Sequence, residues 1–272
     1  MRAFYRYPLK DFEKENAAEE ARCLAAVEHI FASRANNSDA VAGCIVEPIL
    51  AEGGDKSASH DFFRQLRALC SKYGTTNITT VFCVDLRCCC RYDVVFIVDE
   101  VQTGLYSTGD VWAHQAWQLS DAPDIITFSK KMLTGGFYYK PYLTAPFTYQ
   151  VFNTWMGDAL RSLQLNTVID VAQKQNLGQR AKDSGEVLYS GLQELSAKYP
   201  SLISNVRGRG TFLAFDCPNL DTRAALTSKT LGLGVNVGVS GEVSCRLRPA
   251  LTFGPRHAAQ VLDAMDKALA TM

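Results

Sequence analysis

The alternation of short apolar runs with amphipathic helical stretches is the feature that most constrains the fold of this chain. Residues 41–46 and 94–98 are apolar runs of the kind found in strands buried on both faces. Residues 13–32 and 59–72 place apolar side chains at helical spacing, and Gly74 ends the second pattern. Because strands that alternate with helices form parallel sheets, the first half of the chain is predicted to be α/β.

Charged residues follow each predicted strand. Glu47 comes directly after the first apolar run, Asp99 comes after the second, and Glu52 lies in a glycine-rich loop. A third apolar segment, 124–129, leads into Lys130. The carboxyl ends of parallel strands meet at one edge of a sheet, where ligands bind. We therefore expect the three acids and the lysine to gather at that edge, with Glu47 in a structural role.

The second half of the chain shows a different pattern. A long helix is predicted from about 158 to 198, and a last helix from about 257 to 272. Short strands are predicted between them, at 206–215, 234–238 and 245–249. Short strands between helices are typical of a smaller α+β domain, joined here through the long helix.

Composition and charge exclude several classes of protein. Lys and Arg total 28 and Asp and Glu total 28, so no net field draws the chain to nucleic acid or to anionic lipid. No run approaches the ~20 apolar residues of a membrane helix. The basic N-terminus is not followed by an apolar region, so no targeting segment is predicted. We expect no nucleic-acid partner and no membrane association.

Residues 75–93 do not fit the strand and helix rhythm. A connection from a helix to the next strand normally takes about 2 to 6 residues. This longer segment contains Cys83 and the consecutive Cys88, Cys89 and Cys90. Consecutive cysteines point in diverging directions, so no metal site is expected and an insertion, natural or from the gene model, is favoured. A cysteine-based metal or redox module remains an alternative interpretation.

Four segments in a fixed order carry a family resemblance. They read IVEP at 45–48, FIVDEVQTG at 96–104, TFSKKMLTGG at 127–136 and FNTW at 152–155. In this wording and spacing the chain resembles the class-III (ω-amino acid) aminotransferases, which use pyridoxal 5′-phosphate. Further matching segments are 19–24, 52–55, 206–212 and 246–249. The resemblance covers nearly the whole chain except 75–93.

The resemblance implies the α/β architecture of a fold type I pyridoxal phosphate transferase. Residues 1–157 would be the incomplete remainder of a large, mostly parallel cofactor domain. Residues 158–272 would be the connecting helix and the small C-terminal α+β domain. In the family a phosphate-binding loop, a stacking aromatic and a second arginine lie in sequence that precedes the counterpart of Met1. We therefore expect the chain to correspond to the C-terminal part of the family fold.

The resemblance also implies roles for individual residues. By resemblance, Lys130 would hold the cofactor aldehyde and move a proton. If the segment is extended, its neighbour Lys131 points the other way, so only one of the two lysines can take this role. Asp99 would face the pyridine nitrogen and keep it protonated. Gln102 would contact the ring hydroxyl. Thr154 would bind the cofactor phosphate across the interface of a homodimer.

Two further residues bear on the substrate. By resemblance, Arg246 would bind the α-carboxylate of glutamate or 2-oxoglutarate, and Glu52 would pair with Arg246 when an ω-amino acid is bound. The implied reaction is transfer of an amino group from 4-aminobutyrate, or a similar ω-amino acid, to 2-oxoglutarate, giving succinate semialdehyde and glutamate. The implied compartment is mitochondrial or cytoplasmic. The alternative is a catalytically incompetent fragment from a truncated or misassembled gene product.

Overall fold

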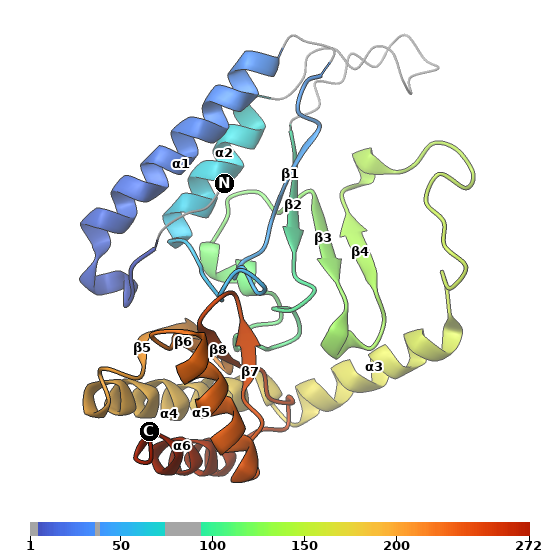
Figure 1. Cartoon of the computed structure of the whole chain (residues 1–272). Helices are drawn as coiled ribbons and strands as arrows, with labels where there is room; N and C mark the ends of the chain where they lie inside the picture. The colour runs from blue at the N-terminus through green and yellow to red at the C-terminus, as the bar shows by residue number, and fades with distance from the viewer. Residues whose placement is uncertain (1–4, 36–38, 74–93) are drawn as a thin grey trace.

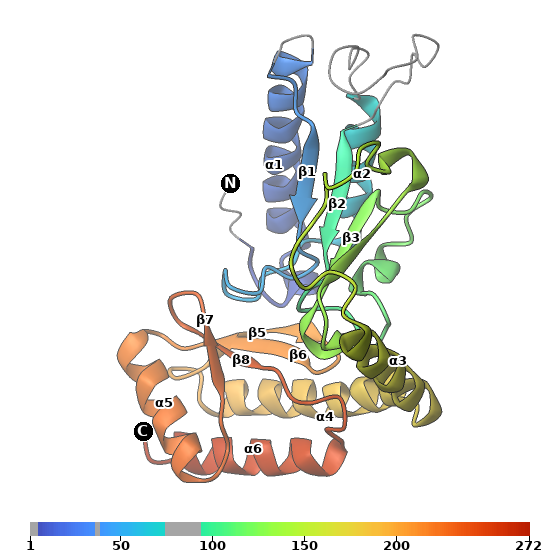
Figure 2. The same cartoon turned by 90° about the vertical axis from the view of Figure 1, so that its right-hand side faces the viewer.

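The computed structural model describes residues 5–35, 39–73 and 94–272, and it contains two sheets of four strands each (Figure 1). The first sheet belongs to the first half of the chain and the second sheet to the second half. Figure 2 shows the second sheet and its helices lying beneath the strands of the first. The two halves meet where the strands of the first sheet end.

The first sheet is mixed and mostly parallel, as predicted. Its strands are β1 (Gly43–Val46), β2 (Val95–Asp99), β3 (Ile125–Phe128) and β4 (Gly136–Tyr139), hydrogen-bonded in that order. The first two pairings are parallel, and β4 runs antiparallel to β3. In this register Asp99 lies opposite Thr127, so their side chains lie on the same face of the sheet.

Two helices cover one face of this sheet. Helices α1 (Glu13–Arg34) and α2 (His60–Lys72) pack over β2, where Phe96 and Val98 are fully buried. Helix α2 begins at Ser59, whose hydroxyl accepts a hydrogen bond from the backbone of Phe62, a standard N-terminal cap. The alternate residues of β2, which include Asp99, point to the opposite face and are only partly buried.

Short 3-10 helices complete the first half. They are η1 (Leu9–Asp11), η2 (Ala113–Trp117), η3 (Lys130–Met132) and η4 (Pro141–Leu143). The segment after Ser129 is therefore a tight turn, so the condition of an extended segment at Lys130 and Lys131 is not met. Leu133 ends the turn in the left-handed conformation, which reverses the chain into β4.

The predicted helix from 158 to 198 is two helices. Helix α3 (Ala159–Lys174) starts at Asp158, whose carboxylate accepts two backbone N–H groups, and α4 (Leu177–Lys198) follows after a break. Asn176 lies at the break with φ of 50°, in the left-handed region that asparagine tolerates better than most residues. The single-helix prediction was wrong because neither glycine nor proline marks this break.

The second sheet is antiparallel. Its strands are β5 (Ser204–Arg209), β6 (Phe212–Asp216), β7 (Gly238–Ser240) and β8 (Ser244–Leu247), in the order β5-β6-β8-β7. The strand predicted at 234–238 was misplaced, since β7 begins at Gly238. Helix α5 (Leu220–Gly232) was not predicted, although Asn219 caps it, and α6 (Pro255–Leu269) corresponds to the predicted last helix.

Both faces of the second sheet are covered. Helices α4, α5 and α6 bury its lower face around Phe215 and Met265, which are fully buried. On the other face, Phe212 packs against Ile49 and Ala51 from the first half of the chain. Strand β6 is thus buried on both sides and joins the two halves. In the described part of the chain, no helix is long and apolar enough to cross a membrane.

Candidate active site

A cavity of about 700 Å³ opens at the carboxyl ends of the parallel strands. Glu47, Glu52 and Asp99 all line it, as the parallel topology leads one to expect, and Ser244 of β8 adds a residue from the second sheet. Burial raises the pKa of Glu47, whose carboxylate accepts a hydrogen bond from the backbone of Ala51 at 3.0 Å. This contact holds the turn after β1 and fits the structural role expected for Glu47.

Asp99 lies at the end of β2 on the face opposite α1 and α2. Its Oδ1 accepts a hydrogen bond from the backbone N–H of Val101 at 2.9 Å, and its Oδ2 has no partner among the described residues. Thr127 lies opposite it on β3, and the Thr127 hydroxyl oxygen is buried without a partner in the described residues. A buried hydroxyl that makes no hydrogen bond costs about 1 to 3 kcal/mol, so this position favours a ligand with polar atoms.

Lys130 begins the turn that follows β3. Its φ is 51°, a left-handed conformation that costs a non-glycine residue about 1 to 2 kcal/mol and often marks a functional site. The side chain is exposed, and its charge helps to lower the pKa of Glu52. Lys131 is partly buried instead. Burial above all, together with the charges of Arg248 and Lys130, lowers the pKa of Lys131 to about 8.

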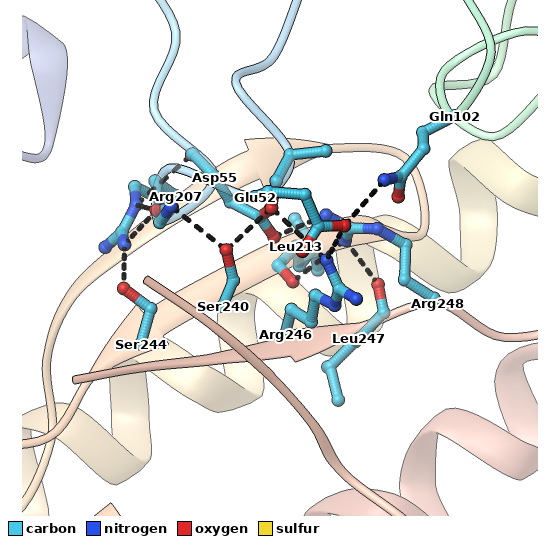
Figure 3. Close-up of polar contacts among 12 residues, drawn as sticks. Glu52, Asp55, Gln102, Arg207, Leu213, Ser240, Ser244, Arg246, Leu247 and Arg248 are labelled. Atoms are coloured by element: carbon cyan, nitrogen blue, oxygen red, sulfur yellow. Dashed lines mark hydrogen bonds and ion pairs between the residues drawn. The ribbon is translucent and has the colours of Figure 1, made fainter. Parts of the chain in front are cut away.

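Glu52 and Arg246, predicted to form a pair, are in contact. Arg246 NH1 donates to Glu52 Oε1 at 2.9 Å, and Gln102 Nε2 donates to the same oxygen at 2.9 Å (Figure 3). These two hydrogen bonds, that of Arg246 above all, lower the pKa of Glu52. Two predicted site residues thus converge on the carboxylate of a third, and the sequence did not indicate this contact for Gln102.

Thr154 is not part of this cluster within one chain. It is exposed in the turn between η4 and α3, among side chains that are also exposed. The structure therefore brings Glu52, Gln102 and Arg246 together and places Asp99 with Glu52 in the lining of the cavity. Lys130 is not in that lining, although its charge acts on Glu52, and Thr154 lies apart. The four cysteines at 83 and 88–90 lie outside the described residues, in which no cluster of potential metal ligands occurs.

A buried network supports the residues after β2. Glu100 is fully buried, and its Oε1 accepts a hydrogen bond from the backbone of His114 at 2.9 Å and lies 2.8 Å from the His114 Nδ1. Its Oε2 accepts a hydrogen bond from the Thr103 hydroxyl. This network fixes the turn between Asp99 and Gln102, and His114 takes part in it through hydrogen bonds to Glu100.

The sequence profile described as Aminotransferase class-III matches residues 2–80 and 74–269 of this chain. The chain belongs to the class-III aminotransferase family. The segments on which the resemblance rested all lie within these matched residues. The overlap of the two matches, 74–80, lies at the start of the predicted insertion.

Curated relatives support the same family. The chain is 44% identical over 265 residues to 4-aminobutyrate aminotransferase, mitochondrial, from Sus scrofa. It is 43% identical to the protein of the same name from Homo sapiens and 42% identical to the 4-aminobutyrate aminotransferase of Schizosaccharomyces pombe. These matches cover 96–97% of this chain but 49–51% of the relatives. The chain spans about half the length of the curated relatives it matches.

Solved structures confirm the fold. Lysine aminotransferase from M. tuberculosis in the internal aldimine form has a TM-score of 0.82 and 28% identity, covering 100% of this chain and 57% of that structure. Acetylornithine aminotransferase from Elizabethkingia anophelis has a TM-score of 0.76 over 92% of this chain and 58% of that structure, at 24% identity. The fold is that of the fold type I pyridoxal phosphate-dependent aminotransferases, with a mostly parallel sheet and a smaller α+β part.

Proposed function

We propose that this chain carries the C-terminal part of the active site of a pyridoxal phosphate-dependent aminotransferase that acts on 4-aminobutyrate or a similar ω-amino acid and on 2-oxoglutarate. The observation that carries the proposal is the convergence of Gln102 and Arg246 on Glu52, which lines the same cavity as Asp99. The products are succinate semialdehyde and glutamate. The identity of 42–44% to proteins named 4-aminobutyrate aminotransferase supports this choice of substrate.

The residues at the sheet edge fit pyridoxal 5′-phosphate. Lys130 offers an exposed amine at a conformationally strained position, Asp99 offers a carboxylate oxygen without a partner in the described residues, and Thr127 offers a buried hydroxyl in need of one. When bound, the cofactor supplies an electron sink for charge that develops on the substrate carbon. Asp99 keeps the ring nitrogen protonated, because a carboxylate beside a cation stabilises its charged form. Gln102 orients the ring hydroxyl.

Lys130 has two tasks in this proposal. Its amine holds the cofactor aldehyde at rest, and it carries a proton between substrate carbon and cofactor carbon during each half-reaction. Lys131 does not take this role, because it is the more buried of the two amines and lies toward Arg248.

Glu52 and Arg246 distinguish the two substrates. An ω-amino acid has no α-carboxylate, so Glu52 stays hydrogen-bonded to Arg246 and neutralises it. When 2-oxoglutarate or glutamate binds, its α-carboxylate takes the guanidinium through a bidentate contact, and Glu52 moves away. The high exposure of the Glu52 side chain, 71%, leaves it free to move, while the Arg246 side chain is 23% exposed.

A second copy of the chain is the proposed partner, with Thr154 binding the cofactor phosphate of that copy. The turn that carries Thr154 and the start of α3 expose an unusual number of large apolar side chains: Tyr149, Phe152, Trp155, Met156, Leu160 and Leu163, each more than half exposed. Apolar patches of this kind mark protein interfaces. Light scattering is expected to show a dimer that Trp155→Asp converts to a monomer, and a monomeric parent chain would contradict this.

The proposal also covers the division of the chain into two units and the compartment of the enzyme. We assign cofactor binding to residues 1–157 and the smaller unit to residues 158–272, with 75–93 as an insertion. The relatives from Sus scrofa and Homo sapiens are named as mitochondrial, so we propose a mitochondrial or cytoplasmic enzyme.

A coupled assay tests the function. The purified chain, supplied with pyridoxal 5′-phosphate, 4-aminobutyrate and 2-oxoglutarate, is expected to form glutamate and succinate semialdehyde in equal amounts. Lys130→Ala is expected to abolish turnover, while Lys174→Ala, far along α3, is the matched control and leaves it unchanged.

The second candidate is a non-catalytic fragment, which the half-length match to the relatives favours. Absence of product from the parent chain, in a preparation shown to be folded, would overturn the catalytic proposal in favour of this alternative.

A further inference from the structure

The loop at 51–55 of the first half is hydrogen-bonded to the second sheet at several points. The backbone carbonyl of Ala51 accepts a hydrogen bond from the Ser240 hydroxyl at 2.6 Å, and that of Glu52 accepts one from Gly241 N–H at 3.2 Å. The Ser240 hydroxyl also accepts the Gly54 N–H at 3.0 Å. These bonds cross between the two halves of the chain, and Figure 3 shows the loop lying on the antiparallel strands.

Arg207 of β5 makes the largest share of these contacts. Its Nε donates to the carbonyl oxygens of Gly54 and Asp55 at 3.1 and 3.3 Å, and its NH2 also donates to the Gly54 carbonyl. The guanidinium is itself held, since NH2 donates to Asp216 at 2.7 Å and to the Ser244 hydroxyl at 2.8 Å. The Arg207 side chain is 2% exposed.

Local backbone geometry aims Arg207 at the loop. The pairing of β5 with β6 shifts register between Ser204 and Arg207, and Asn205 in this bulge has φ of 53°. The Asn205 carbonyl accepts a further hydrogen bond from Arg207 NH1 at 2.7 Å. The Tyr7 ring covers the guanidinium, with its centroid 5.1 Å from Cζ. The bulge and the ring hold the guanidinium where its Nε and NH2 reach the carbonyl oxygens of Gly54 and Asp55.

The loop has little room to adopt another position. Gly54 has φ of 93°, and a Cβ there would lie 3.2 Å from the Ser244 hydroxyl. Gly241 has φ of 53°, and a Cβ there would lie 3.1 Å from the Gly54 Cα. Only glycine allows this close approach of the two backbones. The rigid loop fixes the backbone position of Glu52, while the Glu52 side chain remains exposed and able to move.

We propose that Arg207 is a positioning residue that fixes the loop 51–55 so that Glu52 meets Arg246 and Gln102. This inference rests on the proposed function for its meaning, because Glu52 and Arg246 are the pair that distinguishes the two substrates. Arg207 touches neither substrate nor cofactor in this account. It acts on substrate choice through the backbone of Gly54 and Asp55, from the far side of the loop.

The titration of Glu52 tests the inference without cofactor or turnover. Carboxyl ¹³C NMR of the full chain is used, with Glu52→Gln to assign the signal. Arg207→Lys keeps the charge but cannot hold both carbonyls in a planar fork. We expect the Glu52 pKa to rise toward its usual value of 4.5 and the Gly54 amide to exchange at least ten times faster.

The control is a substitution at an arginine far from the loop, and the contrary result requires that the variant is folded. Arg256→Lys, at an exposed arginine of α6, is expected to leave the Glu52 titration unchanged. The charges around Glu52 that remain in every variant are Arg246, Arg248, Lys130 and Glu47. A Glu52 pKa that is unchanged in folded Arg207→Lys would overturn the inference.

A second variant covers the case in which Arg207→Lys does not fold. Asp216→Asn keeps the shape of the side chain but weakens its hold on the Arg207 guanidinium, so a smaller rise in the Glu52 pKa is expected. No change in folded Asp216→Asn would count against the inference. The titration of Glu52 needs no enzymatic activity. An inactive chain would therefore contradict the proposed function without contradicting the role of Arg207.

Discussion

The two sheets are covered differently. The antiparallel sheet has three helices on one face and the loop around Ala51 on the other, and four residues in a row on β6 are buried. The mostly parallel sheet has helices on one face only, and Ile45 on its other face is 62% exposed. Asp99 and Thr127 lie on that less covered face. The second sheet is therefore buried on both faces, and the first sheet leaves one face with polar side chains open to a ligand.

Substitutions of phenylalanine in the two sheets test this difference most strongly. Phe215 of β6 is 0% exposed, so Phe215→Ala is expected to lower the free energy of unfolding by about 3 to 5 kcal/mol. Phe137 of β4 is 42% exposed, and Phe137→Ala is expected to cost about 0.5 kcal/mol or less. Urea denaturation of both variants provides the check. If the two variants lose similar amounts of free energy of unfolding, the two sheets do not differ in how tightly they are packed.

The next largest effect belongs to a buried ion pair in the first half. Arg67 NH1 donates to Asp124 at 2.9 Å, with side chains 8% and 1% exposed, and Asp124 also accepts the Phe96 N–H. Arg67→Met is expected to cost about 3 kcal/mol, at the low end for such pairs because Lys140 remains 3.1 Å from Asp124.

Arg64→Met is the matched control for that pair. Its partner Asp61 and Arg64 itself are both largely exposed, so a loss of at most about 1 kcal/mol is expected. If thermal unfolding shows that Arg67→Met and Arg64→Met lower the free energy of unfolding equally, the buried ion pair does not stabilise the first half more than an exposed one.

The smallest predicted effect is a pH dependence from Lys131, which lies where the halves meet. Its folded pKa is about 8, against 10.5 for an ordinary lysine, so the unfolded chain binds more protons between these values. Stability should therefore rise with pH across this window, by about 1 kcal/mol given partial exposure. Lys131→Met should remove that rise in a pH series of urea denaturations. A rise that persists in Lys131→Met would assign it to another group.

Much of the first half could be predicted from the sequence because its signals are local. The apolar runs at β1, β2 and β3 and the capped pattern of α2 specify strands and a helix without tertiary help. The break at Asn176 was missed because a single left-handed asparagine inside a helical pattern is a weak local signal. Strand β7 was misplaced and α5 missed because short, glycine-flanked segments carry little periodicity.

The site could be predicted in part for the same reason. Strand topology alone places Glu47, Glu52 and Asp99 at one edge, and the structure has them there. The contact of Gln102 with Glu52 and the clamp from Arg207 join residues far apart in sequence. No spacing rule reaches across such separations, so these contacts needed the folded chain.

The most direct test of the central claim is to map the lysine that binds the cofactor. The chain is incubated with pyridoxal 5′-phosphate, treated with borohydride to fix the adduct, and analysed by peptide mass spectrometry. The account predicts one labelled lysine, Lys130, and a label that weakens strongly in Asp99→Asn. A label on Lys131, or one spread over surface lysines and unaffected by Asp99→Asn, would contradict it.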